Sequence, residues 1–176
     1  DPVTDVAAGA SVTSSTDGSQ SLFTDVAVSM PANEGIDRLT FTAGPVRDGA
    51  DEVLKIGGKS VPLVNGTTVT DAANGVTYTV TVDVNGIATV TATYATDLTA
   101  ATMQAALESV TYANLHVTPT AGQRTVEFTS MSDSGTPGST VAVNLDGVVN
   151  VKPAVDAFGA AAQAKLDTAV PTGSTV

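Results

Sequence analysis

The sequence predicts an all-β protein, an antiparallel β-sandwich with one short internal helix. Short runs rich in Val and Thr are separated by Asn-Gly, Asp-Gly and Gly-Gly pairs, which are typical of turns between strands. Apolar and polar residues alternate with a period of two in much of the chain, and helical spacing interrupts this pattern. At 176 residues the chain is long enough to bury the core of one such domain.

The clearest local signal is the stretch from Gly75 to Tyr94. Valines and Tyr78 alternate with threonines as far as Val84, the pair Asn85-Gly86 follows, and a second alternating run ends at Tyr94. This pattern predicts a β-hairpin with one apolar face and one threonine face, joined by a tight turn that needs a positive φ at Gly86.

Weaker alternation predicts further strands elsewhere. They are Ser21 to Met30, Ile36 to Ala43, Glu52 to Ile56, Lys59 to Leu63, Arg124 to Met131 and Ser139 to Val151. The pair Gly57-Gly58 predicts a tight turn between the third and fourth of these strands.

One segment has helical spacing inside the strand-rich region. The apolar residues Leu98, Met103, Ala106, Leu107 and Val110 recur at helical spacing, and Asp97 or Thr99 is available as the N-cap. We therefore expect one helix over Asp97 to Val110, crossing an end or flank of the sandwich.

The chain divides into three parts by composition. Residues 21–152 form the predicted sandwich module. Residues 1–20 are rich in Ser, Thr, Ala and Gly and are expected to be a lead-in segment, with an edge strand around Ala10 to Thr13. Residues 153–176 are alanine-rich, and a helix over Ala154 to Val170 is expected there, acting either as a linker or as a helix that docks on another surface.

Composition excludes several functions. There is no cysteine, so disulfides, thiolate metal sites and cysteine nucleophiles are absent, which favours an extracellular location. The net charge of −11 argues against nucleic acid as a partner, because phosphate binding needs a basic surface. No apolar run is long enough to span a bilayer, so direct membrane insertion is not expected. We expect the chain to be part of a longer protein.

Several short motifs together carry a resemblance. They are the run Asp48 to Gly58, the helix Leu98 to Val110, Thr111-Tyr112-Ala113-Asn114, the run Pro119 to Val126 and Ser132-Asp133-Ser134-Gly135. In this order and spacing, the region from Leu22 to Val151 resembles repeat modules of large bacterial repetitive adhesins. That group includes RTX-type and biofilm-associated surface proteins with tandem cadherin-like or immunoglobulin-like domains.

The resemblance implies an Ig-like or cadherin-like sandwich in an extracellular stalk at the bacterial surface, with neighbouring modules of the same chain as partners and Ca²⁺ as a stiffening ion. One departure concerns the ion. The strings Asp-x-Asn-Asp-Asn and Asp-x-Asp-x-Asp-Gly, which supply the usual calcium ligands, do not occur here.

Four carboxylates are the candidate metal ligands. Asp48, Asp51 and Glu52 lie within five residues and supply the hard oxygen atoms that Ca²⁺ prefers, and Asp133 is a second candidate. The alternatives are a solvated acidic loop for the first three and a plain turn for Asp133. A shared site requires that the fold bring these loops to the same end of the sandwich.

Other polar residues favour structural roles. Arg124 is expected to pin a loop through carbonyl groups or a carboxylate, and Tyr112 with Asn114 is expected to form a corner motif that ties down a crossing connection. His116 is the only histidine and is expected in a loop or at the surface. No catalytic motif is present, so we expect the protein not to be an enzyme.

These observations favour a non-catalytic extracellular module of a bacterial surface adhesin, acting as a spacer or extender in cell adhesion or biofilm formation. The alternative is a calcium-dependent module that binds a glycan or a peptide through its loops.

Overall fold

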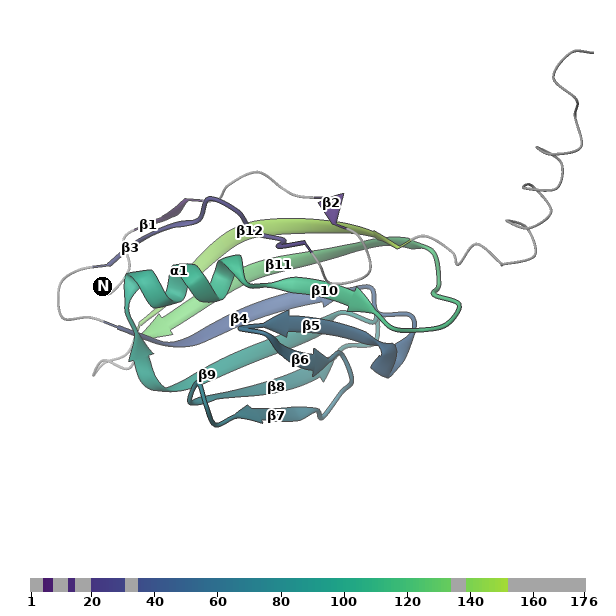
Figure 1. The fold of residues 1–176 in the computed structure, drawn as a ribbon, viewed down its shortest axis with the longest axis horizontal. Coiled ribbons are helices and arrows are strands. Elements are labelled where there is room, and N and C mark those ends of the chain that lie inside the picture. Colours follow the sequence, from purple (N-terminus) through teal and green to yellow (C-terminus); the bar gives the residue numbers. More distant parts are fainter. Residues whose placement is uncertain (1–4, 8–12, 15–19, 31–34, 134–138, 152–176) are drawn as a thin grey trace, which may run out of the picture.

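The computed structural model describes residues 5–7, 13–14, 20–30, 35–133 and 139–151. It confirms the all-β sandwich with one short α-helix (Figure 1). The strands are β1 (Asp5–Ala7), β2 (Thr13–Ser14), β3 (Ala27–Ser29), β4 (Ile36–Gly44), β5 (Glu52–Ile56), β6 (Lys59–Pro62), β7 (Thr68–Asp71), β8 (Val76–Val82), β9 (Ala88–Leu98), β10 (Thr111–Asn114), β11 (Gly122–Asp133) and β12 (Thr140–Val151). The helices are the 3₁₀ turn η1 (Gly49–Asp51) and α1 (Ala100–Glu108).

A seven-stranded sheet forms one layer of the sandwich. Its strand order is β2-β12-β11-β4-β9-β8-β7, and every neighbouring pair is antiparallel except β12 and β2, which run parallel. The short strand β2 pairs through Thr13 and Ser14 at the edge of this sheet. It overlaps the edge strand expected around Ala10 to Thr13 at Thr13, and residues 10–12 lie outside the described residues.

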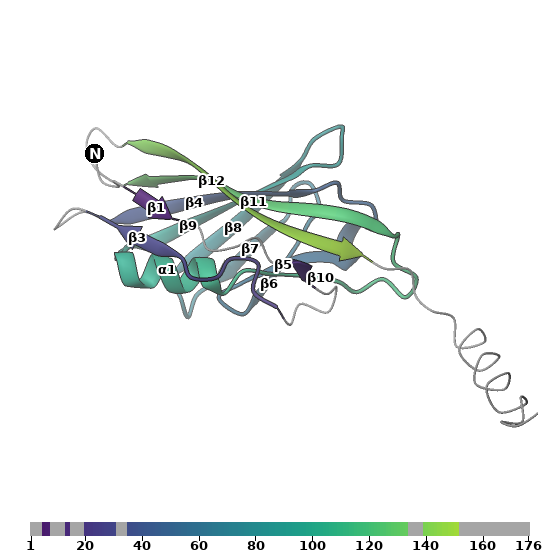
Figure 2. The same ribbon diagram turned by 90° about the horizontal axis from the view of Figure 1, so that it is seen from above.

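The second layer is made of smaller pieces. A three-stranded antiparallel sheet, β10-β5-β6, covers one part of the large sheet, and α1 with the β1-β3 pair covers another part (Figures 1 and 2). The chain passes between the two sheets through residues 45–51, after β4, and again through residues 115–121, before β11. Since Gly44 pairs with Thr125, both connections lie at the same end of the sandwich, which we call the crossing end.

Side chains that alternate along the strands fill the space between the layers. In β8 and β9, Val76, Tyr78, Val80, Val90 and Ala92 are buried, as the hairpin pattern predicts. A row of three phenylalanines lies at the centre of the core, with ring centroids 6.4 Å apart for Phe23 and Phe41 and 5.2 Å apart for Phe41 and Phe128. Pairs at these distances add about 1 kcal/mol each to the free energy of burial.

Helix α1 is the predicted helix, shortened at both ends. Thr99 is the N-cap: its side chain accepts a hydrogen bond from the Thr102 N–H, and the Thr102 hydroxyl accepts one from the Thr99 N–H. Leu98, expected at the helix start, is the last residue of β9. Met103 and Leu107 bury one face of the helix against the core. No helix in the described part of the chain is long and apolar enough to cross a membrane.

Some local predictions are wrong or incomplete. The expected strand from Ser21 to Met30 is reduced to β3, because Leu22 leaves the strand path to pack in the core and donates its N–H to the carbonyl of Val110 at 2.8 Å. Strands β7 and β10 were not expected. The expected C-terminal helix over 154–170 lies outside the described residues.

The connection between β8 and β9 is longer by one residue than an Asn-Gly turn. Asp83 and Ile87 close a loop of Val84, Asn85 and Gly86, and the Gly86 N–H donates to the Asp83 carbonyl at 3.1 Å. Val84 is therefore fully exposed, whereas the alternation predicted that it would lie on the apolar face. The predicted positive φ at Gly86 is confirmed at 80°, and the Gly86 carbonyl accepts a hydrogen bond of 2.7 Å from the Val46 N–H.

Replacing Gly86 with alanine should destabilise the protein more than replacing Gly66 with alanine. Both glycines have a positive φ, which costs an L-residue about 1–2 kcal/mol. A Cβ atom at Gly86 would also lie 3.0 Å from the Val46 carbonyl oxygen, whereas one at Gly66 meets nothing within 4 Å. Urea unfolding of both variants measures the difference, and equal midpoints would contradict the close approach at Gly86.

Candidate functional site

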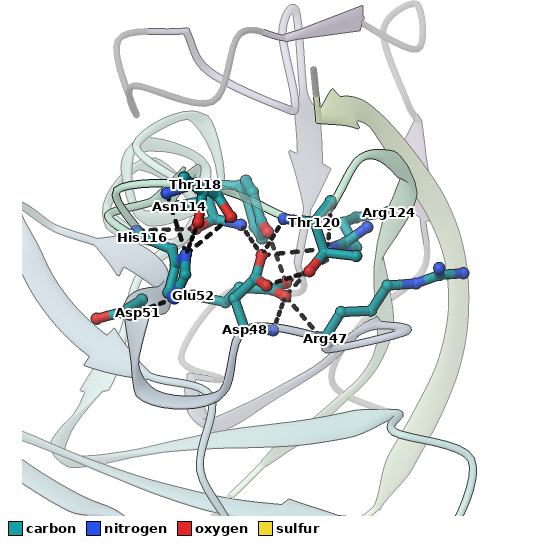
Figure 3. A network of polar contacts seen from close by, with 10 residues as sticks. Arg47, Asp48, Asp51, Glu52, Asn114, His116, Thr118, Thr120 and Arg124 are labelled. Carbon is teal, nitrogen blue, oxygen red and sulfur yellow. Dashed lines mark hydrogen bonds and ion pairs between the residues drawn. The ribbon is translucent and has the colours of Figure 1, made fainter. Parts of the chain in front are cut away.

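The predicted acidic cluster lies at the crossing end, where β4 leads into β5. Figure 3 shows Asp48 beside Asn114, the last residue of β10, and Thr120 of the second connection, and it shows Asp51 on the side of His116. The backbones of the two connections also meet, since the Leu115 N–H donates to the Asp51 carbonyl at 2.7 Å. The cluster is thus a junction between segments about sixty or more positions apart in the sequence.

Glu52 is the centre of this junction and has no solvent exposure. Its carboxylate accepts two hydrogen bonds from the equally buried Arg124 guanidinium, from Nε at 3.0 Å and from Nη2 at 3.1 Å. The Tyr112 hydroxyl donates at 2.6 Å, and the backbone N–H groups of Arg47 and Asp48 donate at 2.6 and 2.8 Å. A carboxylate offers about four lone-pair positions, so these donors saturate it.

The pKa values of the three buried groups follow from these contacts. Burial raises the pKa of the Glu52 carboxyl, but the hydrogen bonds from Arg124, Tyr112 and two backbone N–H groups outweigh it and hold the pKa below its ordinary value. Burial lowers the pKa of Arg124, and Glu52 more than restores it. Burial and the bond to Glu52 both raise the pKa of Tyr112. Glu52 and Arg124 are therefore charged at neutral pH, and Tyr112 is neutral.

Asp48 extends the junction toward the surface. It accepts hydrogen bonds from the Asn114 side chain at 2.7 Å, from the Thr120 N–H at 2.9 Å and from the Thr120 hydroxyl, and it lies 3.8 Å from Arg124 Nη2. Burial raises the pKa of Asp48, and these hydrogen bonds bring it below its ordinary value. The same Nη2 also donates to the Thr120 carbonyl at 3.1 Å. Residues of both connections thus converge on two carboxylates.

Asp51 and Asp133 differ from this pair. The Asp51 carboxylate is half exposed and lies 3.9 Å from His116, which is exposed as expected. Asp133 is at the other end of the sandwich, because it lies nine positions after Arg124 on β11, about 30 Å away at the rise of an extended strand. Its carboxylate accepts hydrogen bonds from the Ser139 N–H at 2.8 Å and from the Ser139 hydroxyl at 3.2 Å. The turn expected after Asp133 lies outside the described residues.

The four predicted ligands are therefore not brought together. Glu52 is saturated by protein donors, Asp133 is remote, and in the described chain no group of three or more His, Cys, Asp or Glu residues is arranged to hold a metal ion. This set of residues does not fit a single Ca²⁺ site, which needs six to eight oxygen ligands. Calcium binding by the chain stays a prediction, which melting curves with calcium and with a chelator test directly.

The prediction for Arg124 is confirmed, since it pins the second connection through both a carboxylate and the Thr120 carbonyl. Tyr112 and Asn114 do tie connections down, but through Glu52 and Asp48 side chains and from within strand β10.

A second feature has no counterpart in the sequence predictions. It is a half-open pocket of about 310 Å³ between α1, the turn after β5 and the adjoining ends of β8 and β9. Its lining residues are Ile56, Gly57, Asn74, Val76, Tyr78, Tyr94, Leu98, Thr102, Ala105 and Ala106. These positions are spread over four separate segments, so no local pattern could have identified them.

Removing one partner of the buried Glu52–Arg124 ion pair should lower the free energy of unfolding more than removing both partners. Arg124→Met leaves Glu52 charged and buried without a counter-ion, and should lower the free energy of unfolding by about 3–5 kcal/mol. The double variant Glu52→Gln/Arg124→Met should recover about 1–3 kcal/mol of that loss. Exposed Arg38→Met is the control, with a change within about 0.5 kcal/mol. Strictly additive losses in urea unfolding would contradict the coupling.

The stabilisation by Glu52 should depend on pH in a defined direction. Its pKa is lower in the folded chain than the ordinary value of 4.5, so its stabilising effect is complete above that pH and is lost as the pH falls through the folded pKa. The difference in unfolding free energy between wild type and Glu52→Gln should therefore be largest at neutral pH and shrink below pH 4.5. A gap that stays constant through the acid range would show that another group carries the effect.

Comparisons with protein-family models, with curated proteins and with solved structures find no match for this chain. The resemblance to adhesin modules therefore stays an expectation from sequence motifs.

Proposed function

We propose that this chain is a non-catalytic spacer module of an extracellular bacterial adhesin, one that separates the segments before and after it along a surface stalk. The observation that carries the proposal is the position of the first and last described strands. The β1-β3 pair lies at the end of the sandwich remote from the crossing end, whereas β12 ends at Val151, opposite Gly122, at the crossing end (Figure 1).

This arrangement supports a spacer because the chain gains length as it passes through the module. Strand β12 alone has 12 residues and spans about 40 Å at about 3.3 Å per residue. A net charge of −11 adds repulsion between successive acidic modules, which opposes side-by-side association.

The junction at the crossing end supports the same role. It lies beside the point where β12 leaves the described sandwich, since Arg124 pairs with Val149 across the β11–β12 ladder. Buried charges with well-formed hydrogen bonds favour one arrangement of the connections over looser ones. A spacer needs such a defined end if its direction is to be passed on to the next module.

A tandem protein of two copies of this chain tests the proposal. Its maximum dimension in small-angle X-ray scattering should exceed that of one copy by about 40 Å or more, with an unchanged cross-sectional radius of gyration. The increase should persist at about 1 M salt, where the Debye length is about 3 Å, because it comes from the fold and not from repulsion alone. A thicker cross-section with little gain in length would contradict the proposal.

Location is tested separately. Antibodies raised against the chain should label intact cells of the bacterium that carries it, and brief protease treatment of those cells should remove the signal. Labelling that requires permeabilised cells would exclude an extracellular stalk. Recurrence of similar modules in the parent protein would favour the spacer over a ligand-binding role.

A further inference from the structure

We propose that the pocket beside α1 is a binding site for one compact, uncharged apolar ring or side chain, of the size of a phenol. This inference does not depend on the spacer function, because it rests on the shape and chemistry of the pocket alone.

The pocket exists because the second layer of the sandwich is incomplete. The three-stranded sheet ends at the Gly57-Gly58 turn, and α1 covers only part of the remaining face of the large sheet (Figure 1). Apolar side chains of β8 and β9 point into the space between them, among them Val76, Tyr78 and Tyr94. The volume of about 310 Å³ lies at the lower limit of typical small-molecule sites.

Hydrogen bonds hold the walls of the pocket in place. The Gly57 N–H donates to the Ser109 hydroxyl at 2.7 Å, and that hydroxyl donates to the Ala106 carbonyl at 2.6 Å, which ties the turn to the end of α1. The Tyr78 hydroxyl donates to the Ile56 carbonyl at 3.3 Å. The turn, the helix and the sheet are thus connected around the pocket, so binding requires little rearrangement.

Tyr94 supplies the polar group that would orient a ligand. Its hydroxyl has no hydrogen-bond partner among the described residues, although the side chain is more than half buried and lines the pocket. Burial raises the pKa of Tyr94 to about 12, so the hydroxyl keeps its proton at neutral pH. The hydroxyl oxygen is not one of the fully buried unpaired atoms of the described chain, so it is open to the pocket, where a polar atom of a ligand can accept its hydrogen bond in place of water.

The lining decides the class of ligand. None of the ten lining residues is charged, and an ion placed here would lose hydration without gaining a counter-charge. A sugar would leave most of its hydroxyl groups facing apolar side chains. A cavity of about 150 Å³ is enough for benzene, so this pocket has room for a substituted ring. A phenol matches both the apolar walls and the Tyr94 hydroxyl, either as a free molecule or as a tyrosine side chain of a peptide.

Amide NMR titrations with matched probes test the site. p-Cresol should give saturable shifts at residues around the pocket, with a Kd of about 1 mM or below. Toluene, which lacks the hydroxyl, should bind about 2–10-fold more weakly, the value of one hydrogen bond. If the natural ligand is a tyrosine side chain of a polypeptide, the peptide Gly-Tyr-Gly should bind as well as p-cresol. If the natural ligand is a free phenol, p-cresol should bind and Gly-Tyr-Gly should not. Methyl glucoside should not bind. Non-saturable p-cresol shifts, or equal binding of methyl glucoside, would overturn the proposal.

Three variants distinguish binding in the pocket from binding elsewhere on the surface. Ala106→Leu fills the pocket and should abolish p-cresol shifts, whereas Ala101→Leu, exposed on the same helix and outside the lining, should leave them unchanged. Tyr94→Phe keeps the ring and should remove the preference for p-cresol over toluene. This variant tests the proposal independently if Ala106→Leu proves unstable. Unchanged p-cresol binding in a folded Ala106→Leu, or an unchanged preference in Tyr94→Phe, would overturn the proposal.

Discussion

Between the two sheets, at the end where the chain crosses from one to the other, a carboxylate and a guanidinium meet without access to solvent. Removing two charges from water costs several kcal/mol for each ion, and the Glu52–Arg124 pair offsets that cost with two direct hydrogen bonds and further donors from Tyr112 and the backbone. Arg124 Nη1 is buried without a partner in the described chain, so the compensation is incomplete. The pair therefore contributes more to selecting one arrangement of β5, β10 and β11 than to net stability, since an apolar substitute would avoid the desolvation cost.

The incomplete second layer is the other constraint that organises the molecule. Seven strands on one side face three strands, one helix and a two-stranded ribbon on the other. The N-terminal part of the chain compensates in part, because Leu22 and Phe23 enter the core from outside either sheet. Gly147 in β12 makes this possible, since a Cβ atom there would lie 2.8 Å from the Cβ of Leu22. Where no such segment arrives, the pocket beside α1 remains.

Much of the fold follows from local sequence, and the site does not. The β8–β9 hairpin was predictable because Val76 to Val82 and Ala88 to Tyr94 each alternate with a period of two, on either side of a turn. Strand β7 was missed because it has a single apolar residue, Val69, among threonines and an aspartate, and its place comes from pairing with β8. The motifs drew attention to Glu52, Tyr112 and Arg124 one by one. Glu52 and Arg124 are 72 positions apart, and only the tertiary structure brings them together. Because the sequence does not show this pairing, Glu52 and its neighbouring carboxylates could be interpreted from the sequence as metal ligands.

The parallel pairing of β2 with β12 has a mechanical consequence. Force that reaches β2 from its N-terminal side and β12 from its C-terminal side pulls two parallel neighbours in opposite directions along their length. The hydrogen bonds between them are then loaded together, in shear, and must break together. An antiparallel terminal pair pulled from one end would instead open one bond at a time. A module in a stretched stalk would thus resist rupture through its shortest strand, although β2 pairs through only two residues.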